Sequence, residues 1–198
     1  FSCIIQKFYS YGSLIQKSIM SSTIICLCYF AVHFVEGKPD KQFFGLTLNG
    51  WRSSLINSVW LTIIMVLIMI LFKYLAILYL PSFYQKPFFS GWFFRNQSFI
   101  PVVLSASFYI ILVFVQVLVA RGIIQGALNE IFEGPYKVWS AIVVSNLIFA
   151  SLHIINFPFL TTVLVFFVGI PWGWLYSKDR TLLGVFLSHA IIGVFGVW

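Results

Sequence analysis

Charged residues are scarce in this chain. They make up 9% of its 198 residues, whereas a soluble domain carries roughly 25%. Together with a hydrophobic content of 61%, this deficit excludes an ordinary soluble domain and predicts an integral membrane protein. At this length we expect residues 1–198 to form a single membrane domain, without a sizeable soluble domain in addition.

Acidic residues are scarcer than basic residues. Five Asp and Glu stand against twelve Lys and Arg, which gives a net charge of +7. In a soluble protein this balance would suggest nucleic acid as a partner. Here the basic residues lie between apolar runs, where they anchor helix ends to anionic headgroups, and no dense basic block occurs. We therefore expect the lipid bilayer as a partner and no nucleic acid.

Cysteine is also rare. Cys26 and Cys28 are two positions apart in an apolar run, so they point to different faces of a helix, and Cys3 lies far from both. A structural zinc site takes about four ligands, and the chain has no second cysteine pair. The three cysteines are therefore predicted to be ordinary buried thiols. The chain begins with Phe rather than Met, so we expect it to be a trimmed chain or a fragment, and we expect no cleavable signal peptide in this sequence.

Long apolar runs dominate what is present. They predict an all-α, polytopic transmembrane bundle of about six spans with interfacial segments between them. The predicted spans cover residues 18–34, 55–80, 99–120, 137–155, 159–176 and 181–198, and residues 81–97 form a surface loop. No inverted repeat of the kind found in secondary transporters is present. We expect a multi-pass protein of the plasma membrane.

Several polar residues interrupt these runs. Lys73 is expected to reach an interface or to mark a helix break, because an unpaired ammonium group inside the bilayer costs several kcal/mol. Gln125, Asn129 and Glu133 follow one another at four-residue spacing and predict one polar helix face. The stretch VGIPWGW, residues 168–174, predicts close approach of helix backbones. His33 is expected at the membrane interface.

Two histidines lie near the ends of apolar runs, His153 and His189. A titratable ring inside hydrocarbon is costly, so it usually faces a protein interior or a water-filled cavity. Asn146 lies seven positions before His153 and is predicted to share its helix face. One alternative is that both histidines only form hydrogen bonds between helices.

The C-terminal part of the chain, about residues 105–198, resembles the CAAX-protease and bacteriocin-processing (CPBP, or Abi) family of intramembrane proteases, and residues 1–104 then hold N-terminal helices. Members of that family carry Glu-Glu-x-x-x-Arg, Phe-x-x-x-His and His-x-x-x-Asn motifs on separate membrane helices. Phe149 and His153 match the second motif, and His189 begins the third. Arg121, followed by Gly122, matches the end of the first motif.

The chain departs from the family pattern at two positions. Gln116 and Val117 stand where the first motif has its glutamates, and Gly193 stands in place of the asparagine. Gln116 can orient a water molecule but cannot accept a proton at neutral pH. Asn146 and Asn156 are the candidates to replace the missing asparagine.

The resemblance implies a set of site residues. The implied catalytic residues are His153, His189, Gln116 and Arg121, and the implied binding residues are Asn146, Phe149, Ser188 and Gly193. Gln116 could instead be a polar contact between helices, and Arg121 an anchor at a helix end. We expect no cofactor, because two histidines are fewer than the roughly three protein ligands of catalytic zinc.

Two functions follow from the resemblance. The first is an intramembrane endopeptidase for membrane-associated or prenylated peptides, with activity impaired at the Gln116 position. The alternative is a pseudo-protease that binds such peptides without cutting them, as an immunity or adaptor protein. The sequence leaves open whether the chain is an enzyme and what its oligomeric state is.

Overall fold

A computed structural model describes residues 41–81, 99–154 and 159–195 of the chain. Several predictions lie outside these residues: the span over residues 18–34, the three cysteines, His33, Asn156 and nearly all of the loop over residues 81–97. The described residues form helices joined by turns and loops, with no β-strand among them, which confirms the all-α prediction.

The helices follow in the order α2 (Trp51–Tyr79), α3 (Phe99–Val117), the π-helical segment η3 (Leu118–Gln125), α4 (Gly126–Ile131), α5 (Lys137–Ser151), α6 (Phe159–Asp179) and α7 (Leu183–Phe195). Three stretches are long and apolar enough to cross a membrane: Trp51–Tyr79, Ala106–Ile131 and Phe159–Asp179. Two further apolar helices in the described ranges are shorter, Lys137–Ser151 and Leu183–Gly193. The chain is therefore an integral membrane protein.

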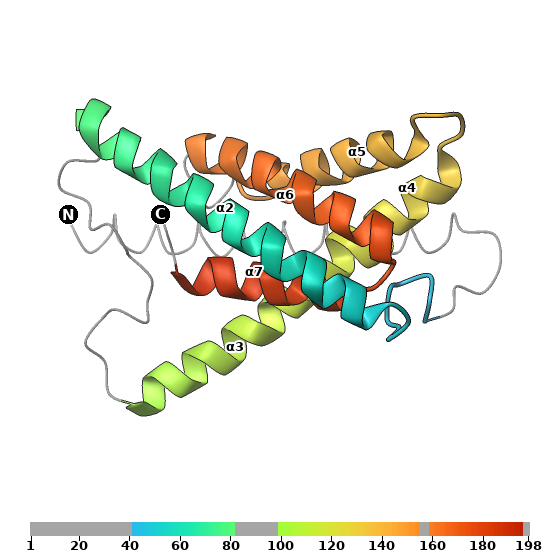
Figure 1. Cartoon of the computed structure of the whole chain (residues 1–198), viewed down its shortest axis with the longest axis horizontal. Coiled ribbons are helices and arrows are strands. Elements are labelled where there is room, and N and C mark those ends of the chain that lie inside the picture. Colours follow the sequence, from blue (N-terminus) through green and yellow to red (C-terminus); the bar gives the residue numbers. More distant parts are fainter. Residues whose placement is uncertain (1–40, 82–98, 155–158, 196–198) are drawn as a thin grey trace, which may run out of the picture.

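Helix α2 lies across α6 and α7 (Figure 1). One of its faces carries exposed apolar side chains such as Leu67 and Leu71, as expected of a surface that meets lipid. The opposite face is buried and includes Met65, Met69 and Lys73. The expectation for Lys73 was wrong on both counts, because α2 continues through it without a break and its side chain is only 2% exposed.

Small and hydroxyl-bearing residues form the contact between α2 and α7. A Cβ added at Gly184 would lie 2.5 Å from the Ser54 carbonyl oxygen, and the Gly184 backbone N–H donates to Ser54 Oγ at 3.1 Å. Farther along, Thr62 Oγ1 and Ser188 Oγ are hydrogen-bonded at 2.8 Å. These contacts allow the two backbones to approach closely, as in other membrane helix pairs.

Helices α3 and α4 form one long element that widens into a π-helix at η3, a geometry often found at functional sites. Residues just before α2 pack against it, and a Cβ at Gly122 would lie 2.5 Å from the Phe44 carbonyl oxygen. The expected polar face is shorter than its sequence spacing suggests. Gln125 and Asn129 are buried, but α4 ends at Ile131, so Glu133 lies beyond it and is exposed.

Helices α5 and α6 lie side by side (Figure 1). At Gly169 an added Cβ would overlap Asn146 Oδ1, and at Gly173 it would lie 2.8 Å from Ile142 Cγ2. The prediction of close backbone approach in VGIPWGW is therefore confirmed. Pro171 lies within α6, which remains one continuous helix from Phe159 to Asp179.

Candidate functional site

His153 and His189 line the same cavity, which has a volume of about 100 Å³. The histidines come from different parts of the bundle, the turn after α5 and the middle of α7. The remaining lining residues are Met69, Phe149, Val165, Val168, Trp172, Ile192 and Gly193. Two imidazoles are thus held within an otherwise largely apolar enclosure.

The position of His153 follows from the end of α5. The helix ends at Ser151, and the His153 backbone N–H donates to the Ala150 carbonyl oxygen at 2.9 Å in a tight turn. His153 Nδ1 lies 3.0 Å from the Phe149 carbonyl oxygen. Because a carbonyl oxygen only accepts, Nδ1 must carry the proton in this bond, and Nε2 is the acceptor of the neutral ring.

His189 is positioned by Trp172 on the neighbouring helix α6. The two rings stack with centroids 4.4 Å apart and planes inclined by 26°. Trp172 is itself fixed, because its Nε1–H donates to Ser188 Oγ at 2.9 Å. Ser188 therefore holds the indole of Trp172, and it does not line the cavity of the two histidines.

Arg121 lies at the centre of a second polar group between η3, α5 and α6. Its side chain is 2% exposed. It donates to Asn146 Oδ1 at 2.6 Å, to the Gly169 carbonyl oxygen at 2.9 Å and to Gln125 Oε1 at 3.0 Å. A longer contact of 3.5 Å joins it to Ser145 Oγ. The guanidinium group thus links η3, α5 and α6 by donating hydrogen bonds to uncharged oxygen acceptors.

Asn146 belongs to this second group and does not line the histidine cavity. The shared helix face predicted for Asn146 and His153 does not form, because α5 ends at Ser151, between them. Gln125 completes the group by donating from Nε2 to the Gly173 carbonyl oxygen at 2.9 Å and to Ser177 Oγ at 2.8 Å.

Gln116 is half-buried on α3, next to the buried Val117, and is not among the lining residues of the histidine cavity. None of the carboxylates in the described ranges lines that cavity either. Glu130 and Glu133 are exposed, and Asp179, at the end of α6, accepts hydrogen bonds from Ser53 and Asn57. Among the described lining residues, the proton acceptors of the cavity are therefore the two imidazoles.

The described residues contain no cluster of three or more His, Cys, Asp or Glu that could hold a metal ion. The two imidazoles of the cavity provide two nitrogen ligands, whereas catalytic zinc takes about three protein ligands. This donor set does not fit a catalytic zinc ion.

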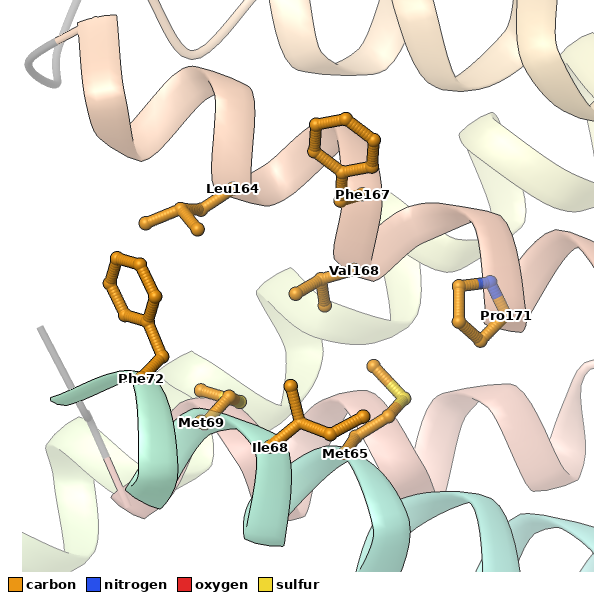
Figure 2. A pocket seen from close by; sticks show the side chains of 8 residues that line it. All are labelled: Met65, Ile68, Met69, Phe72, Leu164, Phe167, Val168 and Pro171. Atoms are coloured by element: carbon orange, nitrogen blue, oxygen red, sulfur yellow. The ribbon is translucent and has the colours of Figure 1, made fainter. Parts of the chain in front are cut away.

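An apolar groove of about 270 Å³ adjoins the histidine cavity. Figure 2 shows its two walls, with Met65, Ile68, Met69 and Phe72 of α2 facing Leu164, Phe167, Val168 and Pro171 of α6. Met69 and Val168 line both the groove and the cavity. A hydrophobic group lying between α2 and α6 would therefore reach the wall of the cavity.

Comparison with known families identifies the part of the chain that holds this site. Residues 98–195, about half of the chain, match the family model described as "Type II CAAX prenyl endopeptidase Rce1-like". The matched region includes both histidines, Trp172 and the Arg121 group. The chain therefore belongs to the CAAX-protease family of intramembrane endopeptidases, as the sequence motifs predicted. No match was found among curated proteins or among solved structures.

Three residues with clear contacts were not predicted as site residues from the sequence. Gln125 lies one helical turn after Arg121, and this spacing was the signal that could have joined it to the site. Trp172 lies within the Gly- and Pro-containing stretch, but nothing in its spacing indicates a stack on His189. Tyr109, whose hydroxyl lies 3.4 Å from the His189 carbonyl oxygen, is 80 positions away in sequence.

Proposed function

We propose that this chain is an intramembrane endopeptidase that cleaves hydrophobic or prenylated peptides at the cavity between His153 and His189. The observation that carries the proposal is the joint lining of one cavity by both imidazoles, next to an apolar groove. Family membership supports the reaction class. The substrate and the roles of individual residues go beyond family membership and belong to the proposal.

His153 has the hydrogen bonding of a general base. Its Nδ1–H is committed to the Phe149 carbonyl oxygen, so Nε2 takes the proton of an attacking water. His189 supplies a second imidazole to hold that water or the substrate carbonyl. Arg121 acts indirectly, by fastening η3, α5 and α6 around the cavity.

The apolar groove suits the hydrophobic part of a substrate. Its lining is apolar, and two of its residues, Met65 and Met69, have flexible side chains that adapt to irregular ligands. A prenyl group or an apolar side chain in the groove would bring the adjacent peptide bond to the shared wall at Met69 and Val168. Binding would then align the reacting carbonyl with the imidazoles.

A second candidate function is a binding protein that does not cleave, acting as an immunity or adaptor protein. Gln116 and Val117 favour it, because they replace the two acidic residues of the family motif. Loss of a positioned general base removes a factor of about 10² to 10⁴ in rate. We place either form in the plasma membrane, which cell fractionation would test.

The experiment that separates the two functions uses the purified chain in lipid vesicles with an internally quenched farnesylated peptide. The endopeptidase predicts cleavage by wild type that His153→Ala and His189→Ala abolish. His33→Ala is the matched control, because it removes the chain's remaining histidine. Binding without cleavage by wild type, with cleavage gained in Gln116→Glu/Val117→Glu, would establish the pseudo-protease instead.

A further inference from the structure

Two successive residues of α7, Ser188 and His189, contact different parts of the same indole. The Trp172 N–H donates to Ser188 Oγ at 2.9 Å, and the face of the indole stacks on the His189 ring. A stack alone leaves a ring free to slide in its plane, whereas a hydrogen bond is directional. The bond to Ser188 therefore fixes which part of the indole lies against His189.

The orientation of the His189 ring depends on this indole. Within the described ranges the ring forms no hydrogen bond, and its aromatic partner is Trp172. The planes of the two rings are inclined by 26°. A rotation of the indole would therefore change the plane of the imidazole and the direction in which its nitrogens point.

Ser188 is held in turn by Thr62 of α2. Thr62 Oγ1 lies 2.6 Å from the Ser58 carbonyl oxygen and 2.8 Å from Ser188 Oγ. Thr62 has one hydroxyl proton and a carbonyl oxygen only accepts, so Thr62 donates this proton to Ser58. The Ser188 hydroxyl then donates to Thr62 Oγ1, while its oxygen accepts from the indole N–H.

These hydrogen bonds run in one direction, from an indole N–H that can only donate to a carbonyl oxygen that can only accept. Thr62, Ser188 and Trp172 are all buried, so water does not take the place of a missing partner. The loss of one hydroxyl therefore leaves a neighbouring polar group unsatisfied and changes the contacts that hold the indole.

We propose that Thr62 is a positioning residue for His189, acting through the Ser188 hydroxyl and the indole of Trp172. This inference rests on the proposed endopeptidase function and adds to it a residue of α2. Thr62 lines neither the histidine cavity nor the apolar groove between α2 and α6. Thr62 and Ser188 are 126 positions apart, and no sequence motif joins them.

Thr62→Val removes the hydroxyl and keeps the branched shape of the side chain. The Ser188 hydroxyl then loses its acceptor, and a serine within a helix turns instead to a carbonyl oxygen one turn earlier, here that of Gly184. This rotation carries Ser188 Oγ away from the indole N–H. The indole is released, and His189 loses its fixed orientation.

The first test measures cleavage of the farnesylated peptide by the full chain in lipid vesicles. For Thr62→Val we expect kcat to fall by about tenfold, since misplacement of a reacting group by about 1 Å can cost about 10²-fold. KM should change less than about threefold, because Thr62 contributes to neither lining and the loss falls on the transition state. Thr62→Ser keeps the hydroxyl and should restore kcat to within about threefold of wild type. Unchanged kcat in an active Thr62→Val enzyme would overturn the inference and leave the endopeptidase standing.

Thr162→Val is the matched control. Thr162 of α6 is 8% exposed, as is Thr62, but its Oγ1 has no hydrogen-bond partner among the described residues. Its exchange removes an equally buried threonine hydroxyl without breaking a hydrogen bond there. Equal losses of kcat in Thr62→Val and Thr162→Val would count against the inference, because the loss would then follow from burial rather than from the contact with Ser188.

A double variant tests whether Thr62 acts through the indole. Trp172→Phe has no N–H, so Ser188 no longer holds the ring in this background. Thr62→Val added to Trp172→Phe should therefore lower kcat by less than about twofold further, since two changes in one hydrogen-bond network are not additive. The same tenfold loss in both backgrounds would mean that Thr62 acts by another route and would overturn the inference.

A last readout does not depend on cleavage. In protein labelled with ¹³C at the histidine rings, a proton of His189 that lies over the indole is shifted upfield by the ring current of Trp172. His189→Asn identifies this resonance. We expect the upfield shift to decrease in Thr62→Val and to persist in Thr62→Ser and Thr162→Val. A decrease in a protein whose wild type does not cleave would keep Thr62 as the residue that positions His189 and refute the endopeptidase function. Equal shifts in wild type and Thr62→Val would overturn the inference whether or not the protein cleaves.

Discussion

The indole of Trp172 stacks on the imidazole of His189 with ring centroids 4.4 Å apart. This contact joins α6 to α7 inside the histidine cavity, and the Trp172–Ser188 hydrogen bond ties the indole back to α7. Ser188 is in turn hydrogen-bonded to Thr62 of α2. The orientation of one imidazole thus depends on three helices.

Variants of Trp172 separate the stack from the hydrogen bond. Trp172→Phe keeps an aromatic face against His189 but loses the N–H, whereas Trp172→Leu loses both. We expect peptide cleavage to fall in the order wild type, Trp172→Phe, Trp172→Leu, with a loss of about 10²-fold in the last, because misplacement by about 1 Å can cost this much. Trp174→Leu, at a 43% exposed position on the same helix, is the control. Equal kcat in wild type and Trp172→Leu would mean that the ring stack only fills space and does not position His189 for catalysis.

The apolar groove can be narrowed without changing the histidine cavity. Leu164 lines the groove on α6 but not the cavity. Leu164→Trp should raise KM about tenfold for a peptide with a long prenyl chain, since displacing about two buried CH₂ groups costs about 1.6 kcal/mol. A peptide with a short apolar group should be affected less. Leu71→Trp, on the exposed face of α2, is the control. An equal rise for both peptides would place the hydrophobic group elsewhere.

The helices were largely predictable from the sequence, because an apolar run of membrane length satisfies its backbone hydrogen bonds inside a bilayer by forming a helix. Predicted spans over residues 55–80 and 159–176 correspond to α2 and α6. The burial of Lys73 was not predictable, because it depends on which helices cover that face of α2. The π-helical segment was missed as well, since apolar periodicity does not distinguish η3 from a continuous α-helix.

The candidate site was predictable only in part. His153 and His189, to which the family motifs pointed, line one cavity together with Phe149 and Gly193, whereas Gln116 is not among its lining residues. The prediction that Asn146 and His153 share a helix face assumed that the helix continues through His153. Helix α5 ends at Ser151, before that residue. The contacts of Trp172 depend on the packing of α6 against α7, which no local pattern in the sequence records.

Glycine at position 169 is required by the packing of α5 on α6. Gly169→Ala would place its Cβ on Asn146 Oδ1 and 3.2 Å from Arg121 Nη2. We expect overpacking to cost about 1–3 kcal/mol and to lower Tm in detergent. Gly126→Ala is the matched control, because its Cβ would meet Phe43 at 3.5 Å, an ordinary contact, and alanine favours the helix. A Tm for Gly169→Ala at or above that of Gly126→Ala would contradict the tight packing.

Arg121 is expected to be more important for stability than for chemistry. Its guanidinium group donates to Asn146, Gly169 and Gln125, and no carboxylate is among its hydrogen-bond partners in the described part of the chain. Arg121→Met removes the buried charge but leaves these oxygen acceptors without their donor, at about 1–3 kcal/mol for each acceptor. Arg121→Lys should also destabilise, because one ammonium group cannot reproduce the planar fork of the guanidinium group.

A double-variant cycle tests this account of Arg121. The Asn146 side chain is buried, and its Nδ2 has no hydrogen-bond partner among the described residues, so the hydrogen bond from Arg121 is its polar contact there. In the Arg121→Met background, Asn146→Leu should therefore cost less than in wild type, with a coupling of about 0.5–3 kcal/mol in the free energy of unfolding. Arg52→Met is the control, since Arg52 is exposed at the start of α2. Strictly additive costs would mean that Arg121 and Asn146 do not stabilise each other, and that the guanidinium group does not fasten η3 to α5.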